Sequence, residues 1–247
     1  MSPSTQIGDE GAARLQALLE KARAKSKGEA PAAPQVFVGE DRVAVELVRS
    51  MLWWESGRAG ADAAMAALGG HVVDLNELRV CLPDEITGML GPGDPRAQER
   101  AERLRACLND VFAREHDVRL AHLAEEGKRD VRAYLESLDG MHPFVAARVV
   151  LLCFGGHAFP IDARLRDCLA KHKVVPPETP AGDAGSWMER QFRAGEAAEA
   201  YLLLEACAEQ SAGKPGGKRG GTAKPAGDTR TKKKSPAKPR KRSNAEK

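Results

Sequence analysis

Residues 128–169, KRDVRAYLESLDGMHPFVAARVVLLCFGGHAFPIDARLRDCL, decide the fold. A helical pattern leads into a tight turn at 138–142, LDGMH, after which Pro143 opens a second and very apolar helix. That helix ends at a Gly-Gly pair, residues that suit a helix C-terminus. A short loop, HAFPID, then presents Asp162 at the start of another helix. The stretch therefore predicts two helices joined by a hairpin, followed by a carboxylate at the N-terminus of a third.

Helical patterns continue on both sides of this stretch. From about residue 40 to 210, apolar residues recur at helical spacing, as in Val43, Leu47, Val48, Met51 and Leu52. Strand signals are limited to VFV at 36–38 and VVDL at 72–75. We therefore expect an all-α domain over residues 35–210. A short helix and an Ala/Pro linker precede it at 1–34, and a separate segment follows at 211–247.

The formal net charge of +3 hides a strong asymmetry. Residues 211–247 carry 13 Lys/Arg and two acids, whereas residues 1–210 carry 25 basic and 33 acidic residues. The final segment contains no Val, Ile, Leu, Met, Cys or aromatic residue, so it cannot bury enough apolar surface to fold, and we expect it to be disordered. Its basic clusters favour double-stranded DNA as the partner, although a solubilising or localisation tail is an alternative. The expected DNA contacts in this tail are Lys232, Lys233, Lys234, Arg240, Lys241 and Arg242.

Composition argues against several classes of protein. No apolar run approaches the roughly 20 residues of a membrane span, and the N-terminus lacks a signal-peptide core. The five cysteines are scattered without a CxxC pair, which is typical of reduced thiols in a cytosolic protein. The six histidines show no metal-ligand spacing, and no P-loop or dinucleotide-binding fingerprint is present. We expect a cytoplasmic protein associated with DNA or the nucleoid (nuclear in a eukaryote), with no metal and no membrane partner.

The central stretch resembles the helix-hairpin-helix (HhH-GPD) DNA glycosylases, of which endonuclease III is the familiar member. That superfamily carries a hairpin of the form L-P-G-V-G-x-K-T-A, an apolar helix, and a loop ending in V-D-T-H. Here the corresponding residues read LDGMHPFVA at 138–146, an apolar helix at 147–154, and FPIDAR at 159–164. The spacing matches without gaps from Leu138 to Leu165, and fainter similarity extends from about residue 40 to about residue 210.

The resemblance implies a two-lobed, all-α architecture and a function in base-excision repair. In the superfamily, the aspartate that matches Asp162 stabilises positive charge on the sugar, or activates water, as the N-glycosidic bond breaks. The hairpin holds a DNA phosphate through backbone amides, and the target base is flipped into a cleft between the lobes. The expected DNA contacts of the body are Leu138, Gly140, Met141 and His142 in the hairpin, with Arg148 and Arg164 near the proposed cleft.

Three comparisons with the superfamily pattern narrow the expected chemistry. The Schiff-base lysine of bifunctional members falls at Phe144, so we expect monofunctional hydrolysis rather than lysine-dependent lyase chemistry. The iron–sulfur loop needs four closely spaced cysteines, and only Cys207 lies near the C-terminal end, so no cluster is expected. Trp53 and Trp54 fall near the helix end that probes the DNA stack, which makes one of them a candidate base-stacking or wedge residue.

Each assignment has an alternative. Asp162 can serve simply as a helix N-cap, and the two tryptophans as core residues. The rival function is a protein of the same fold that has lost catalysis and acts as a structural or damage-sensing DNA-binding protein through its linker-histone-like tail. A helical protein–protein interaction module is a third hypothesis.

Overall fold

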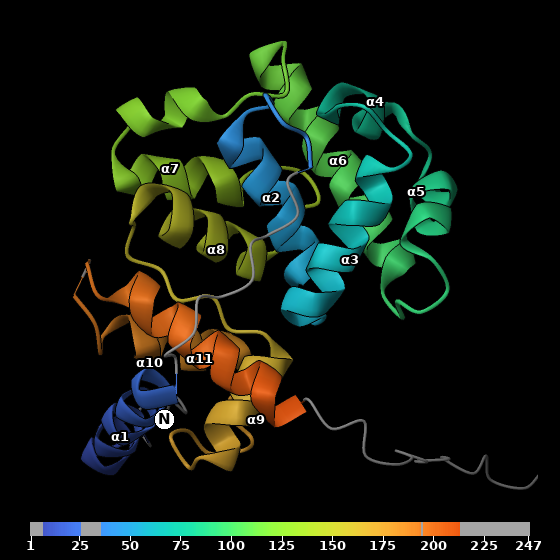
Figure 1. Ribbon diagram of the computed structural model, residues 1–247. Helices are drawn as coiled ribbons and strands as arrows, with labels where there is room; N and C mark the ends of the chain where they lie inside the picture. Colours follow the sequence, from blue (N-terminus) through green and yellow to red (C-terminus); the bar gives the residue numbers. More distant parts are fainter. Residues whose placement is uncertain (1–6, 26–35, 194, 213–247) are drawn as a thin grey trace, which may run out of the picture. The chain divides into compact units, whose positions relative to one another are not determined.

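The computed structural model describes residues 7–25, 36–193 and 195–212, and these stretches are helical without a β-strand (Figure 1). The predicted all-α domain is confirmed; VFV lies in a turn, and VVDL leads into a helix. No helix in the described ranges is long and apolar enough to cross a membrane. The expected disordered tail lies, from residue 213 on, outside the described residues.

The helices are α1 (Asp9–Lys25), α2 (Arg42–Trp53), α3 (Gly57–Gly69), α4 (Leu75–Val80), α5 (Pro83–Leu90), α6 (Ala97–Glu115), the 3₁₀ helix η2 (Ala121–Glu125), α7 (Lys128–Glu136), α8 (Pro143–Phe154), α9 (Ala163–Lys171), α10 (Ala181–Glu189) and α11 (Ala197–Ala212).

The first lobe is a hydrophobic cluster built around α2. Asp41 starts this helix, because its carboxylate accepts hydrogen bonds from the backbone N–H groups of Val43 and Ala44, both at 2.9 Å. Leu47 and Met51, from the stripe that the sequence indicated, are completely buried. The helix packs against α3, α6 and α8 (Figure 1). The apolar periodicity therefore marks the helix at the centre of this lobe.

The second lobe is a separate hydrophobic cluster formed by α1, α9, α10 and α11. Figure 1 shows α1, from the N-terminal end, beside α11, from the C-terminal end of the described chain. The apolar helix α8 belongs to both lobes, since Val149 and Val150 pack in the first cluster and Leu151 packs in the second. The predicted two-lobed architecture is confirmed, and α8 is the helix that joins the lobes.

Interactions between buried polar groups also connect the two lobes. Arg148 of α8 is 3% exposed and forms an ion pair with Glu46 of α2. Its guanidinium donates to the hydroxyl of Ser50 at 2.8 Å, and to the hydroxyl of Tyr201, in the second lobe, at 3.1 Å. Burial raises the pKa of Tyr201 well above its usual value, so this hydroxyl stays protonated. Arg148 thus connects three helices from inside the molecule.

We expect Arg148→Ala to lower the free energy of unfolding by about 3 kcal/mol or more, because the variant leaves a carboxylate and a buried hydroxyl without their cation. Urea unfolding followed by circular dichroism measures this loss. As a control, Arg23→Ala removes an exposed ion pair with Glu199 and should cost less than about 1 kcal/mol. Equal losses in the two variants would contradict the role assigned to Arg148.

Candidate functional site

The expected hairpin lies between α7 and α8. The carbonyl of Leu138 accepts a hydrogen bond from the N–H of Met141 at 3.1 Å, which closes the turn. Gly140 has a φ of +72°, and a Cβ atom there would lie 2.8 Å from the carbonyl oxygen of Arg103. The position therefore requires glycine. The side chain of Arg103 also donates to the carbonyl of Gly140 at 3.2 Å, so α6 holds the hairpin in place.

The hairpin presents two backbone N–H groups that no protein acceptor occupies. Within the described part of the chain, the N–H groups of Gly140 and His142 make no hydrogen bond, whereas those of Asp139 and Met141 do. Both groups lie next to the start of α8, where the helix dipole favours an anion. Amides presented by a tight turn at a helix N-terminus suit a phosphate group.

An aromatic and arginine cluster supports the hairpin. The ring of His142 stacks on Trp54 with the ring centroids 3.9 Å apart. The guanidinium groups of Arg96 and Arg103 lie 4.7 and 5.7 Å from the centroid of the Trp54 ring. Burial first, and then the charge of Arg103, lowers the pKa of His142 to about 4, so the imidazole is neutral at pH 7. Glu99 pairs with both arginines and offsets part of their charge.

Asp162 is the N-cap of α9 and is almost completely enclosed. Its Oδ1 accepts a hydrogen bond from the N–H of Leu165 at 2.9 Å. Its Oδ2 accepts from the N–H of Glu55 at 3.0 Å and from Nε of Arg164 at 3.2 Å. In return, the carboxylate of Glu55 accepts from the N–H of Ala163 at 3.1 Å. The end of α2 and the start of α9 are therefore clamped together, and Asp162 is only 2% exposed.

Glu55 connects this clamp to a pocket. It has a φ of +62°, a left-handed conformation that costs a residue other than glycine on the order of 1 kcal/mol. Such strained residues cluster at functional sites. A pocket of about 520 Å³ opens beside Glu55, between α3 and the segment that joins α5 to α6. The charged side chains that line it are Glu55, Asp94, Arg96 and Arg100.

A second buried carboxylate completes the polar network. Arg164 donates to Oε2 of Glu205, on α11, at 2.7 Å, and Nε1 of Trp53 donates to the same oxygen at 3.0 Å. Oε1 of Glu205 is buried and has no hydrogen-bond partner among the residues that the structure describes. Burial raises the pKa of Glu205, while Arg164 works to lower it. Burial alone would lower the pKa of Arg164, but Glu205 and Asp162 outweigh that effect and raise it. Arg164 is therefore held as a cation between two acids.

The structure places the site residues expected from the sequence in three settings: at the hairpin or the start of α9, buried in the core, or outside the described residues. Gly140, Met141 and His142 form the hairpin, with the side chain of Leu138 buried, and Asp162 and Arg164 lie together at the start of α9. Trp53, Trp54 and Arg148 are 5%, 5% and 3% exposed, so they pack against protein groups and are not part of the surface we propose below. Lys232, Lys233, Lys234, Arg240, Lys241 and Arg242 lie outside the described residues.

The sequence analysis did not single out Glu205. Its signal is an acid inside the apolar run YLLLEACA at 201–208, where a buried carboxylate needs a partner. Arg96 and Arg103 were also missed, because they lie on a charged helix whose sequence does not say which residues approach the hairpin. Phe144, at the position of the superfamily's lysine, is 3% exposed and offers no nucleophile.

The described residues include all five cysteines, and their arrangement does not fit a four-cysteine iron–sulfur cluster. One group of three possible metal ligands does form within the described ranges, from Cys168, His172 and Cys207. The sequence analysis missed it, although the Cys-x-x-x-His spacing at 168–172 places two donors one helical turn apart. The expected absence of a metal therefore stays a prediction.

The lowered pKa of His142 predicts a pH-dependent contribution to stability. Its imidazole binds a proton with a pKa of 6.5 in the unfolded chain but only at about 4 in the folded protein, so stability should fall as the pH decreases between these values. His142→Asn keeps a side-chain acceptor for the helix cap and removes the titration. Relative to wild type, this variant should gain roughly 2 kcal/mol between pH 7 and pH 4.5 in denaturant unfolding. A difference that does not change with pH would contradict the burial of this imidazole.

No family model matches the chain, and no curated protein matches its sequence. Solved structures with a similar fold do exist. A trapped covalent intermediate of endonuclease III with DNA has a TM-score of 0.57 and 12% identity, over 78% of this chain and 84% of that chain. A Clostridium acetobutylicum 8-oxoguanine glycosylase/lyase in complex with double-stranded DNA has a TM-score of 0.60 and 14% identity, over 82% of this chain and 70% of that chain. The resemblance read from the central motif is confirmed at the level of the fold: the chain has the helical fold of the helix-hairpin-helix DNA glycosylases.

Proposed function

We propose that the protein binds double-stranded DNA and removes a damaged base by monofunctional hydrolysis of the N-glycosidic bond. The observation that carries the proposal is the pair of hairpin N–H groups of Gly140 and His142, which no acceptor among the described residues occupies. Asp162, at the start of the next helix, supplies a carboxylate, and its partner Glu55 directly follows Trp54, on which His142 of the hairpin stacks. The proposal is supported by the fold, since structures that share it are in complex with DNA.

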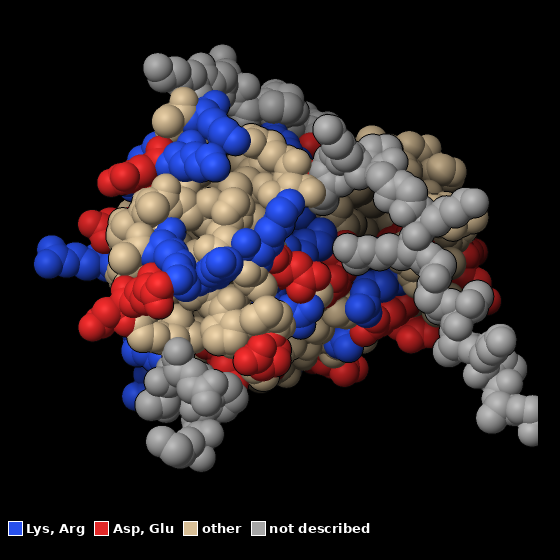
Figure 2. All heavy atoms as spheres, turned by 90° about the horizontal axis from the view of Figure 1, so that it is seen from below, with Lys and Arg blue, Asp and Glu red and all other residues tan. Residues whose placement is uncertain are grey.

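DNA binding combines a local and a long-range attraction. The two hairpin amides hold one phosphate, and the partly exposed Arg96 and Arg103 lie near it. Basic and acidic side chains are intermingled on the face in Figure 2, so that face contributes little general attraction. The basic segment 211–247 supplies the remainder through its charge. A location at the nucleoid, or in the nucleus of a eukaryote, follows from this partner.

Hydrolysis would use Asp162 and water. As the bond between the sugar and the base breaks, its electron pair leaves with the base, and positive charge grows on the sugar. The carboxylate of Asp162 stabilises that charge and orients the water that adds to the sugar carbon, and the proton that this water loses ends on the departing base. Phe144 supplies no amine, so no Schiff base forms and the product is an intact abasic site. The side chain of Arg164 has to leave Asp162 before substrate can reach it.

One observation favours a second function, a DNA-binding protein of this fold without catalysis. Asp162 is 2% exposed and bonded to three donors, so in this conformation neither water nor a nucleotide reaches its oxygens. In this second function the carboxylate is an N-cap that also joins the lobes, and the hairpin and tail alone carry the activity.

Base removal is tested with the full-length protein and duplexes that carry uracil, alkylated purines, oxidised bases or mismatches, with alkali to reveal abasic sites. We expect strand breaks with one class of lesion, and a loss of at least about 100-fold in Asp162→Asn, which keeps the helix cap but not the charge. Asp167→Asn, on the exposed side of the same helix, is the matched control and should retain activity. Full activity in Asp162→Asn would contradict the mechanism, and no cleavage of any duplex, with binding intact, would favour the second function.

The salt dependence of DNA binding separates the tail from the body. Each phosphate contact contributes about −0.9 to the slope of log K against log salt. Deleting residues 213–247, which contain all 13 basic residues of the tail, should reduce the magnitude of the slope by up to about 12 and leave a smaller slope from the hairpin. If no slope remains, the body makes no phosphate contact and the hairpin proposal fails.

A further inference from the structure

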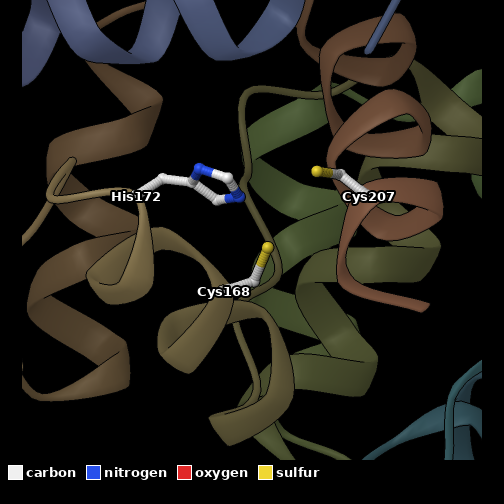
Figure 3. A group of neighbouring side chains, drawn as sticks. All are labelled: Cys168, His172 and Cys207. Atoms are coloured by element: carbon white, nitrogen blue, oxygen red, sulfur yellow. The ribbon is translucent and has the colours of Figure 1, made fainter. Parts of the chain in front are cut away.

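Three side chains with metal-binding atoms meet in the second lobe, away from the groups used above. Cys168 lies on α9, His172 directly follows the end of α9, and Cys207 lies on α11. Figure 3 shows their thiols and imidazole pointing toward a common centre, and the ligand atoms all lie within 4.8 Å of one another. None of the three takes part in the hairpin or in the Asp162 network.

The packing of the two helices creates this arrangement. Leu165 and Leu169, beside Cys168 on α9, and Leu204, beside Cys207 on α11, are completely buried in the same cluster. These apolar contacts set the spacing of the helices before any ion binds. A site that the core already holds together costs less conformational entropy to complete.

The donor set is that of a thiolate-rich metal site. Two sulfurs and one imidazole nitrogen select borderline or soft ions, of which Zn²⁺ is bound tetrahedrally, at about 2.3 Å from sulfur and 2.0–2.1 Å from nitrogen. Neighbouring donors around such an ion lie roughly 3.5 Å apart. Small side-chain rotations can bring atoms that already lie within 4.8 Å to that spacing.

The charges around the group are compatible with a cation that displaces protons. Burial, and then the charges of Lys21, Lys171 and Lys25, lowers the pKa of His172, so its ring is neutral and its nitrogen can coordinate. Burial raises the pKa of Cys168 to about 11, so its thiol is protonated when the site is empty, and zinc binding displaces that proton. Two thiolates neutralise a divalent ion, and the bound site then adds no net charge beside these lysines.

We propose that Cys168, His172 and Cys207 form a zinc site that ties α9 to α11, with water as the fourth ligand. The site differs from an iron–sulfur centre in using two cysteines and a histidine from two packed helices. Zinc bound here stabilises the second lobe and holds α9 in place against α11. The proposal does not depend on the proposed function, since it requires neither DNA nor catalysis.

The test uses the untagged full-length protein, chelator-stripped and kept reduced. Zinc is titrated in competition with a chromophoric chelator, and Co²⁺ then serves as a spectroscopic probe. We expect one equivalent of zinc, a higher unfolding temperature with zinc than without, and a cobalt spectrum with thiolate charge-transfer and strong tetrahedral bands. Loss of an outer-shell partner typically costs 10–100-fold in affinity, so Cys207→Ser and His172→Asn, which remove ligands, should lose more than about 100-fold.

Cys81→Ser is the matched control, because Cys81 lies at the end of α4 in the other lobe, and it should bind zinc like wild type. His172 is partly exposed beyond the helix end, so His172→Asn should retain the fold, which circular dichroism checks. Zinc binding that is equal in wild type and His172→Asn, or a cobalt spectrum without thiolate bands, would overturn the proposal. A reduced protein that binds no zinc but forms a Cys168–Cys207 disulfide in air would overturn it in favour of a redox pair.

Discussion

The guanidinium of Arg164 lies between two buried carboxylates, those of Asp162 and Glu205, and these acids accept the hydrogen bonds by which Glu55 and Trp53 join the first lobe to the second. Two buried acids without a cation would repel each other and would be costly to desolvate. Gly57 makes the approach possible, because it has a φ of +70° and a Cβ atom there would lie 2.9 Å from Nη1 of Arg164. The positive φ favours glycine at the start of α3, where the guanidinium of Arg164 fills the space that a side chain would occupy.

The triad of Arg164, Asp162 and Glu205 affects the two parts of the proposed function, phosphate binding and hydrolysis, in different ways. Within the described residues no acceptor binds the hairpin amides of Gly140 and His142, whereas the carboxylate that would act on the sugar is enclosed. Opening would have to break the contacts of Arg164 with both acids and those of Glu55 with α9. A bound duplex can shift that equilibrium only if it binds the open form more tightly than the closed form. The proposed activity therefore depends on the free-energy difference between the closed and open forms as well as on the chemistry of Asp162.

Helix α9 connects Asp162, at its start, with the proposed zinc site, at its end. Its first turn carries Asp162 and Arg164, and its last turn carries Cys168 and His172. Both ends meet α11, through Glu205 at one end and Cys207 at the other. A metal at the second end, as proposed, would limit sliding and rotation of α9 against α11. Because Asp162 is the N-cap of this helix, such a restraint would also fix the position of its carboxylate.

The helices and the hairpin could be predicted from the sequence because their causes are local. Helical periodicity, Pro143 at a helix start and Gly140 in a left-handed turn act over a few residues, and the spacing from the hairpin to Asp162 is continuous along the chain. Burial of charge is not a local property, since Arg148 and Arg164 lie in ordinary helical positions and two of their partners, Glu46 and Glu205, come from distant helices.

Local patterns of residues were therefore enough to predict the all-helical fold, the hairpin and the place of Asp162 at a helix start. The enclosure of Asp162, the burial of Trp53 and Trp54, and the meeting of Cys207 with Cys168 and His172 became visible only in the packed molecule. The physical reason is that these outcomes depend on which helix faces pack together, and that packing is decided by the burial of two whole clusters of apolar side chains rather than by any one segment.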